Sequence, residues 1–193
     1  MLLIPDFDMI GGVLLNRTVC LAFGSVLTAL ATAVMFLTGV IPVGTYALSG
    51  LAGLTQMIAV MELGSGWAWA VYAASSLLAS LLAADKEAVL CYVLIFGCYP
   101  IVKSIVERRT KRGSALVLKL LFFNAAAVAE FFLAMYLLHV PQNSYNIFGV
   151  NLPWLFLALG NAVFLLYDYA ASLLAMQYWR KFHPTVSKWL HSR

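Results

Sequence analysis

Ionisable residues inside long apolar stretches are where this chain could do chemistry, and Glu130 is the clearest case. It lies well within the apolar stretch Ser114–Leu138, where a carboxylate is costly and usually faces a ligand, a proton pathway or another helix. Lys119 projects from the same helix face, but at about 1.5 Å per residue it is too distant for a direct ion pair. Two interpretations stay open: Glu130 lines a ligand pocket or binds a proton, or it bonds a neighbouring helix. Lys103 and Glu107 are four residues apart, which allows an ion pair along one helix.

A second set of polar side chains lies in the last apolar stretch, Pro153–Trp179. Asn161 and Asp168 are seven residues apart and therefore share one helix face. The depth of Asp168 favours a structural role, which we call a structural tie: a polar contact that holds neighbouring helices together. Asn161 is better placed to contact a ligand. Gln56 and Asn124 lie near the middle of their own stretches, where hydrogen bonds between helices are the more typical role.

Motifs of catalytic chemistry are absent from the sequence. It contains no HExxH, no GxSxG and no phosphate-binding loop, the patterns that place a metal, a nucleophile or a nucleotide. The three histidines have no carboxylate at ligand spacing, and the three cysteines form no CxxC pair. We therefore predict neither an enzyme nor a metal site, and no cofactor.

Six apolar stretches position these residues. Of the whole chain, 63% is hydrophobic and 10% is charged, whereas a soluble domain carries about 25% charged residues. Most stretches have about the 20 residues that a membrane-crossing helix needs: they are Val19–Val40, Thr45–Met61, Trp67–Ala84, Ala88–Val106, Ser114–Leu138 and Pro153–Trp179. We predict an all-α integral membrane protein, a compact bundle of six transmembrane helices. Pro100, preceded by Gly97, is expected to kink the fourth helix.

The basic residues predict the orientation of this bundle. If the first helix starts in the cytoplasm, eleven of the twelve Lys and Arg lie on or just inside the cytoplasmic face, and only Lys86 lies outside. The positive-inside rule then gives cytoplasmic N- and C-termini. We expect the membrane to be a bacterial-type plasma membrane. Lys and Arg residues at the membrane ends attract anionic lipid headgroups. Because this attraction and the orientation of the helices account for the positive charge, we predict no nucleic-acid partner. We divide the chain into an interfacial segment 1–17, a six-helix domain 18–180 and a basic cytoplasmic tail 181–193.

Small residues recur at four-residue spacing on two of the predicted helices. The first has Ala29 and Ala33, and the third has Ala70 and Ala74. Such faces let another helix approach closely, which is the main route to tight packing inside a membrane. Packing within this bundle is the commoner case; the alternative is an external docking face for another membrane subunit.

The six spans, both ends inside and the alanine-spaced faces together resemble the substrate-binding (S) components of energy-coupling factor transporters. In that family an AxxxA motif on the first helix docks against a membrane coupling subunit, and Ala29 and Ala33 match it here. The resemblance implies a micronutrient uptake transporter, with a vitamin-like small molecule bound in the outer half. It also implies a coupling subunit and two ABC-type ATPases as partners. Metal-binding members carry an N-terminal histidine, which this sequence lacks.

The resemblance also suggests which residues would hold the ligand. Tyrosine and tryptophan suit a flat heterocycle because they offer stacking area with a polar handle, and an acidic residue with amides favours a neutral or cationic ligand. The expected ligand-binding residues are Glu130 and Asn161, with Trp154, Tyr145 and Asn143 as lid or stacking partners, and Gln56 as a further hydrogen-bonding group.

Two other functions fit the same sequence. A membrane scaffold or assembly protein would bind no ligand and would recruit a cytoplasmic partner through the basic loop and tail. A small proton-coupled carrier would use Glu130 or Asp168. Glu130→Gln should leave a scaffold with little more than a stability change, and only the carrier should stop when the proton gradient collapses.

Overall fold

The computed structural model describes residues 17–41, 44–137, 146–147, 150–151, 153–183 and 186. The predicted interfacial segment and most of the basic tail lie outside them. The elements are the helices α1 (Arg17–Leu37), α2 (Thr45–Leu82) and α3 (Lys86–Cys91), the π-helix η2 (Tyr92–Phe96), the helices α4 (Tyr99–Arg109), α5 (Arg112–Leu137) and α6 (Pro153–Lys181), and the strands β1 (Asn146–Ile147) and β2 (Val150–Asn151). The two strands pair antiparallel, Asn146 with Asn151 and Ile147 with Val150.

Apolar helices of membrane-crossing length make up most of this structure. Five described helical segments are long and apolar enough to cross a bilayer: Arg17–Leu37, Thr45–Leu82, Lys86–Arg109, Gly113–Tyr136 and Leu157–Lys181. They follow the apolar stretches of the sequence closely. The prediction of a helical, multi-pass membrane architecture is confirmed at this level.

Helix α2 is broken at Gly64, where the chain reverses. Gly64 has φ +82° and ψ 169°, a conformation that side chains with a Cβ rarely adopt. Gln56 Nε2 lies 3.1 Å from Ser75 Oγ although the two residues are 19 positions apart, about 28 Å along a straight helix. Ala52 likewise packs in one cluster with Ala79. The two halves of α2 are therefore antiparallel neighbours, and they coincide with the second and third predicted stretches.

The fourth predicted helix is irregular where Pro100 led us to expect a kink. Within η2 and the turn that follows it the chain is wound more loosely, and Gly97 N donates to Tyr92 O at 2.7 Å. Pro100 lies in the first turn of α4, where its missing N–H costs least. Tyr72 Oη of α2 donates to Val93 O at 2.7 Å, which ties the irregular turn to the bundle. The irregular turns therefore precede Pro100, and a kink caused by Pro100 itself stays a prediction.

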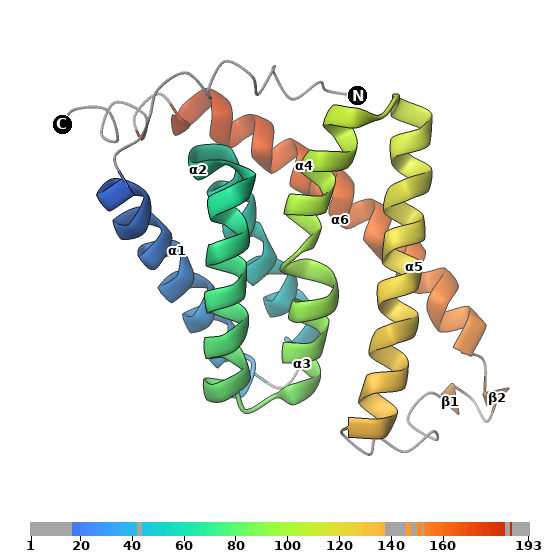
Figure 1. Ribbon diagram of the computed structural model, residues 1–193. Coiled ribbons are helices and arrows are strands. Elements are labelled where there is room, and N and C mark those ends of the chain that lie inside the picture. The colour runs from blue at the N-terminus through green and yellow to red at the C-terminus, as the bar shows by residue number, and fades with distance from the viewer. Residues whose placement is uncertain are drawn as a thin grey trace.

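Helices α1 to α4 form the packed part of the bundle, and α5 and α6 lie at its side. In Figure 1, α6 runs obliquely behind α4 and α5. Within the most apolar window of each helix, 67% of α2 residues are buried in the bundle, against 11% for α5 and 17% for α6. Phe123 of α5 and Phe164 of α6 stack with ring centroids 4.5 Å apart, and both belong to a core cluster with Tyr99 of α4. Aromatic packing and polar contacts therefore hold α5 and α6 in place.

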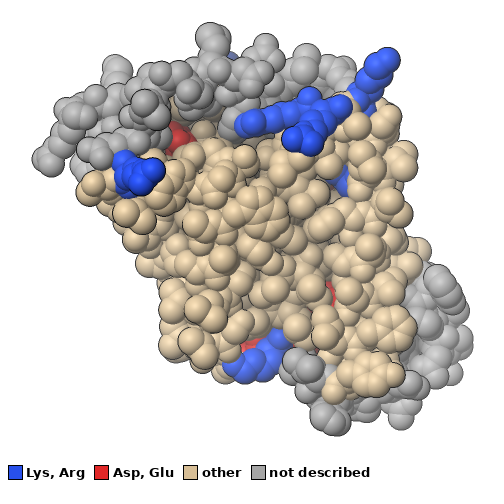
Figure 2. All heavy atoms as spheres, viewed as in Figure 1, with Lys and Arg blue, Asp and Glu red and all other residues tan. Residues whose placement is uncertain are grey.

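Charged side chains gather at the two ends of the bundle. Figure 2 shows Lys and Arg mainly along one edge, a smaller charged group at the other, and a wide, largely uncharged band between them. We call the first edge the basic end: it holds the turn between α4 and α5, the start of α1 and the end of α6 (Figure 1). At the opposite end, Lys86 Nζ donates to Ser80 O at 2.9 Å and to Ala83 O at 3.0 Å.

Candidate functional site

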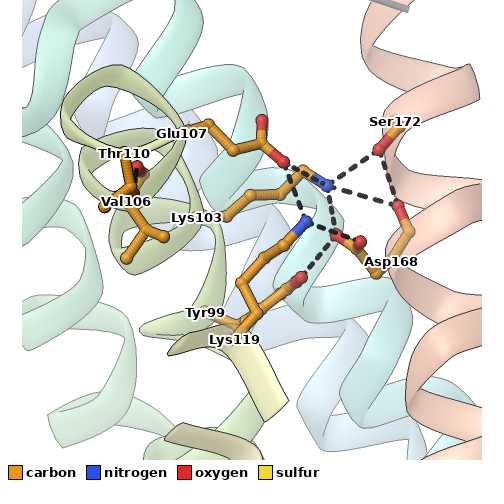
Figure 3. A network of polar contacts seen from close by, with 8 residues as sticks. All are labelled: Tyr99, Lys103, Val106, Glu107, Thr110, Lys119, Asp168 and Ser172. Carbon is orange, nitrogen blue, oxygen red and sulfur yellow. Dashed lines mark hydrogen bonds and ion pairs between the residues drawn. The ribbon is translucent and has the colours of Figure 1, made fainter. Parts of the chain in front are cut away.

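Four ionisable side chains join α4, α5 and α6 towards the basic end, as Figure 3 shows. Asp168 of α6 bridges two lysines: Lys119 Nζ of α5 lies 2.7 Å from Oδ2, and Lys103 Nζ of α4 contacts Oδ1. Glu107 Oε1 of α4 also bridges them, 2.9 Å from Lys119 Nζ and 3.3 Å from Lys103 Nζ. We call Lys103, Glu107, Lys119 and Asp168 the ion cluster.

Neutral groups complete the hydrogen bonding of this cluster. Tyr99 Oη donates to Asp168 Oδ1. Lys103 Nζ donates to Ser172 Oγ at 2.8 Å and to the Asp168 carbonyl oxygen at 3.3 Å. Ser172 Oγ in turn donates to that carbonyl at 2.8 Å. Lys103 thus has an oxygen acceptor for each of its three N–H groups even without Glu107.

Helical spacing explains how the sequence assembles the cluster. Tyr99, Lys103 and Glu107 follow one another at four-residue intervals on α4, and Asp168 and Ser172 do so on α6. Residues four apart project from the same face of a helix. Each helix therefore presents a short polar row, and Lys119 of α5 lies where the two rows meet (Figure 3).

Charge balance lets these groups be buried together. The side chains of Lys103, Lys119 and Asp168 are 3%, 9% and 13% exposed, and that of Glu107 is 29% exposed. Two positive and two negative charges compensate one another, whereas a single buried charge would cost several kcal/mol. Such an arrangement can lock three helices together, and its more exposed edge at Glu107 can exchange partners with solvent.

Sequence reasoning found only part of this cluster. The ion pair between Lys103 and Glu107 is confirmed, and the structural tie favoured for Asp168 agrees with its bonds to both lysines. The meeting of Lys119 with Asp168 was missed. The sequence does contain one indication of this contact. Lys119 and Asp168 carry opposite charges within apolar helices, where a charged side chain needs a partner.

The candidate ligand residue Glu130 lies far from this cluster along α5. Its carboxyl is half-buried and interacts with the Cys91 thiol of α3 and with the charge of Glu87. Glu87 also accepts a hydrogen bond from Tyr46 Oη at 2.6 Å, and neighbouring Asp85 accepts one from Thr45 Oγ1 at 2.8 Å. Three carboxylates therefore gather towards the end opposite the basic end.

Two other candidate ligand residues are engaged within the bundle. Asn161 and Asn124 exchange two amide hydrogen bonds of 3.0 and 2.9 Å between α6 and α5. Gln56 is completely buried; its Nε2 donates to Ser75 Oγ and Tyr92 Oη, while its Oε1 has no partner among the described residues. Interhelical hydrogen bonding, the role expected for Gln56 and Asn124, is confirmed. Ligand contact by Gln56 and Asn161 stays a prediction.

The remaining candidate ligand residues cannot be located in the same way. Asn143 and Tyr145 lie outside the described residues, and Trp154 belongs to α6 but its side chain is not described. Their proposed role as a lid therefore also stays a prediction.

A second polar contact near the basic end was not anticipated from the sequence. Glu62, just before the break in α2, accepts a hydrogen bond from Tyr178 Oη at 2.9 Å and lies 3.0 Å from His183 Nδ1. Its side chain is only 2% exposed. The contact with His183 is an ion pair whenever the imidazole is protonated. The reversal at Gly64 is thereby joined to the end of α6.

The small-residue faces do not pack inside the described bundle. Ala29, Ala33, Ala70 and Ala74 are all exposed. The helices that carry them are nevertheless neighbours, because a Cβ at Gly24 of α1 would lie 3.2 Å from Val71 Cγ2 of α2. Both faces thus remain available to another helix or to lipid.

Among the described residues, no group of three or more His, Cys, Asp or Glu side chains is arranged to hold a metal ion. No family model, curated protein or solved structure matches the chain.

Proposed function

We propose that this protein is the membrane-embedded substrate-binding subunit of an ATP-driven micronutrient uptake transporter, which docks to a coupling subunit through α1 and the second half of α2. The observation that carries the proposal is the exposure of Ala29, Ala33, Ala70 and Ala74 on two neighbouring helices. Small side chains allow backbones to approach closely, which favours helix association in a membrane. Exposed small-residue faces on two neighbouring helices suit a helical partner better than lipid alone.

We further propose six membrane crossings with both termini in the cytoplasm. The reversal at Gly64 divides α2 into two antiparallel halves, which adds a crossing to the five long helical segments. Arg108, Arg109 and Lys111 at the turn between α4 and α5, together with Arg180 and Lys181 at the end of α6, support a cytoplasmic basic end under the positive-inside rule.

Cysteine labelling tests this orientation. A cysteine replacing Ala84 or Asn146 should react with a membrane-impermeant maleimide in intact cells, and one replacing Thr110 should react only after the cells are opened. The native cysteines are all buried, so their background should be low. Labelling of position 110 but not of position 84 in intact cells would reverse the orientation and remove the proposed ligand entrance.

The ligand would enter at the end that faces outside, away from the ion cluster. Support comes from the carboxylates of Asp85, Glu87 and Glu130, which gather there and favour a neutral or cationic ligand. At the basic end the ion cluster joins α4 to α5 and α6 and would keep that side of the bundle closed.

Leucine substitutions test the docking faces. Ala29→Leu with Ala33→Leu should remove most of a co-purifying membrane partner. Each substitution replaces a methyl group by an isobutyl group, which keeps the backbone of the partner helix farther from that of α1. The matched control is Ala158→Leu with Ala162→Leu on α6, which has the same spacing and is also exposed. Immunoblots of partner recovered per tagged chain give the readout. Equal recovery from both pairs of variants would exclude α1 as the docking face.

A further inference from the structure

The ion cluster contains a carboxylate that can leave it. Glu107 is the most exposed of the four side chains, at 29%, and it lies in the last turn of α4 before the turn to α5. Asp168, in contrast, accepts from Tyr99 and both lysines and is 13% exposed. If the cluster opens, Glu107 is therefore the carboxylate expected to move.

Removing Glu107 would expose hydrogen-bond donors on Lys119. An ammonium group has three N–H donors, and among the described residues Lys119 donates to two acceptors, Glu107 Oε1 and Asp168 Oδ2. Lys103 keeps Asp168 and Ser172 as acceptors in either case. Without Glu107, Lys119 would have two N–H groups to offer, and the cluster would carry one net positive charge.

The surroundings favour an anion that arrives from the basic end. Lys119 is seven residues from the start of α5, about 10 Å along the helix, and Glu107 lies between it and that end. The turn beside Glu107 carries Arg109 and Lys111, both exposed. Positive charges grouped at one face raise the local concentration of anions.

We propose that Lys119, beside the positive charge of Lys103, forms a binding site for a phosphate-type oxyanion, and that Glu107 occupies this site when no ligand is bound. Glu107 Oε1, which bridges the two ammonium groups at 2.9 and 3.3 Å, marks where an oxygen of that anion binds. The phosphate could belong to an anionic phospholipid headgroup or to a small soluble anion, since both present the same oxygens. The site is separate from the docking faces of α1 and α2 and does not depend on the proposed transport function.

The test compares Glu107→Gln with Glu87→Gln, the same charge change at the opposite end of the bundle. Binding of inorganic phosphate is measured by calorimetric titration of the full chain in phosphatidylcholine nanodiscs. Retention of phosphatidylglycerol against phosphatidylcholine is measured by native mass spectrometry. Glu107→Gln should bind one of the two probes at least about tenfold more tightly than wild type. The substitution removes the competing charge and so raises the fraction of open sites, and apparent affinity is proportional to that fraction. Glu87→Gln should bind like wild type.

The arm that responds identifies the source of the anion: inorganic phosphate indicates a soluble ligand, and phosphatidylglycerol indicates a lipid. Adding Lys119→Gln to Glu107→Gln should abolish the gain. If that double variant does not fold, the comparison of the two single variants still decides the question. Equal affinities for Glu107→Gln and Glu87→Gln, or no binding of either probe, would overturn the proposal and leave the cluster a purely structural tie.

Discussion

The Asp168→Asn variant is expected to lose about 3–5 kcal/mol of unfolding free energy, the usual cost of removing one partner from a buried ion pair. Asp168 is the centre of the ion cluster, since both lysines bind its carboxylate. Asparagine keeps the shape of the side chain but removes its charge, so Lys103 and Lys119 would share Glu107 alone. Thermal unfolding in detergent, followed by circular dichroism, should show a large fall in Tm.

A charge-balanced double variant separates this electrostatic effect from a loss of shape. Adding Lys119→Gln to Asp168→Asn leaves one lysine and one glutamate. The double variant should therefore be more stable than the sum of the two single changes predicts, by roughly 0.5–3 kcal/mol. Strictly additive losses would show that the two residues do not interact.

Gly53→Ala is expected to give the second largest loss of stability, about 1–3 kcal/mol or more, as overpacking of a tight core does. A Cβ at this position would lie 2.6 Å from the Phe96 carbonyl oxygen and 2.9 Å from Tyr167 Oη. The carbonyl belongs to the backbone of the irregular helix and cannot rotate away. The substitution should therefore push α2 away from η2 and α6.

Gly50→Ala, one turn earlier on α2, is the control. Its added Cβ would meet Tyr167 Cε2 at 3.5 Å, an ordinary van der Waals distance, so its Tm should stay close to that of wild type. Similar Tm values for both alanine variants would mean that Phe96 does not approach α2 as closely as described.

The sequence predicts the apolar helices of this fold well, because each one is encoded locally. The length of an apolar stretch, the glycines around Gly64 and the position of Pro100 each have a direct backbone consequence. The ion pair between Lys103 and Glu107 was predictable for the same reason, since helical spacing alone brings the two together.

The contacts between helices are not encoded in this local way. Lys119 and Asp168 are 49 residues apart. No periodicity in the sequence indicates that α5 and α6 pack so that these two side chains meet beside α4. The same limit applied to Glu62, which meets His183 across 121 positions. Asn161 illustrates the converse: its depth suggested a ligand contact, and its amide is shared with Asn124.

The central claim is that this chain is the substrate-binding part of an ATP-driven transporter. Its most direct test is to purify the tagged wild-type chain from its native membrane in mild detergent and to identify the co-purifying proteins by mass spectrometry. The account predicts two ABC-type ATPases and a larger membrane subunit, recovered in stable proportion to the chain. Recovery of soluble partners through the basic end, without any ATPase, would contradict it and favour a membrane scaffold.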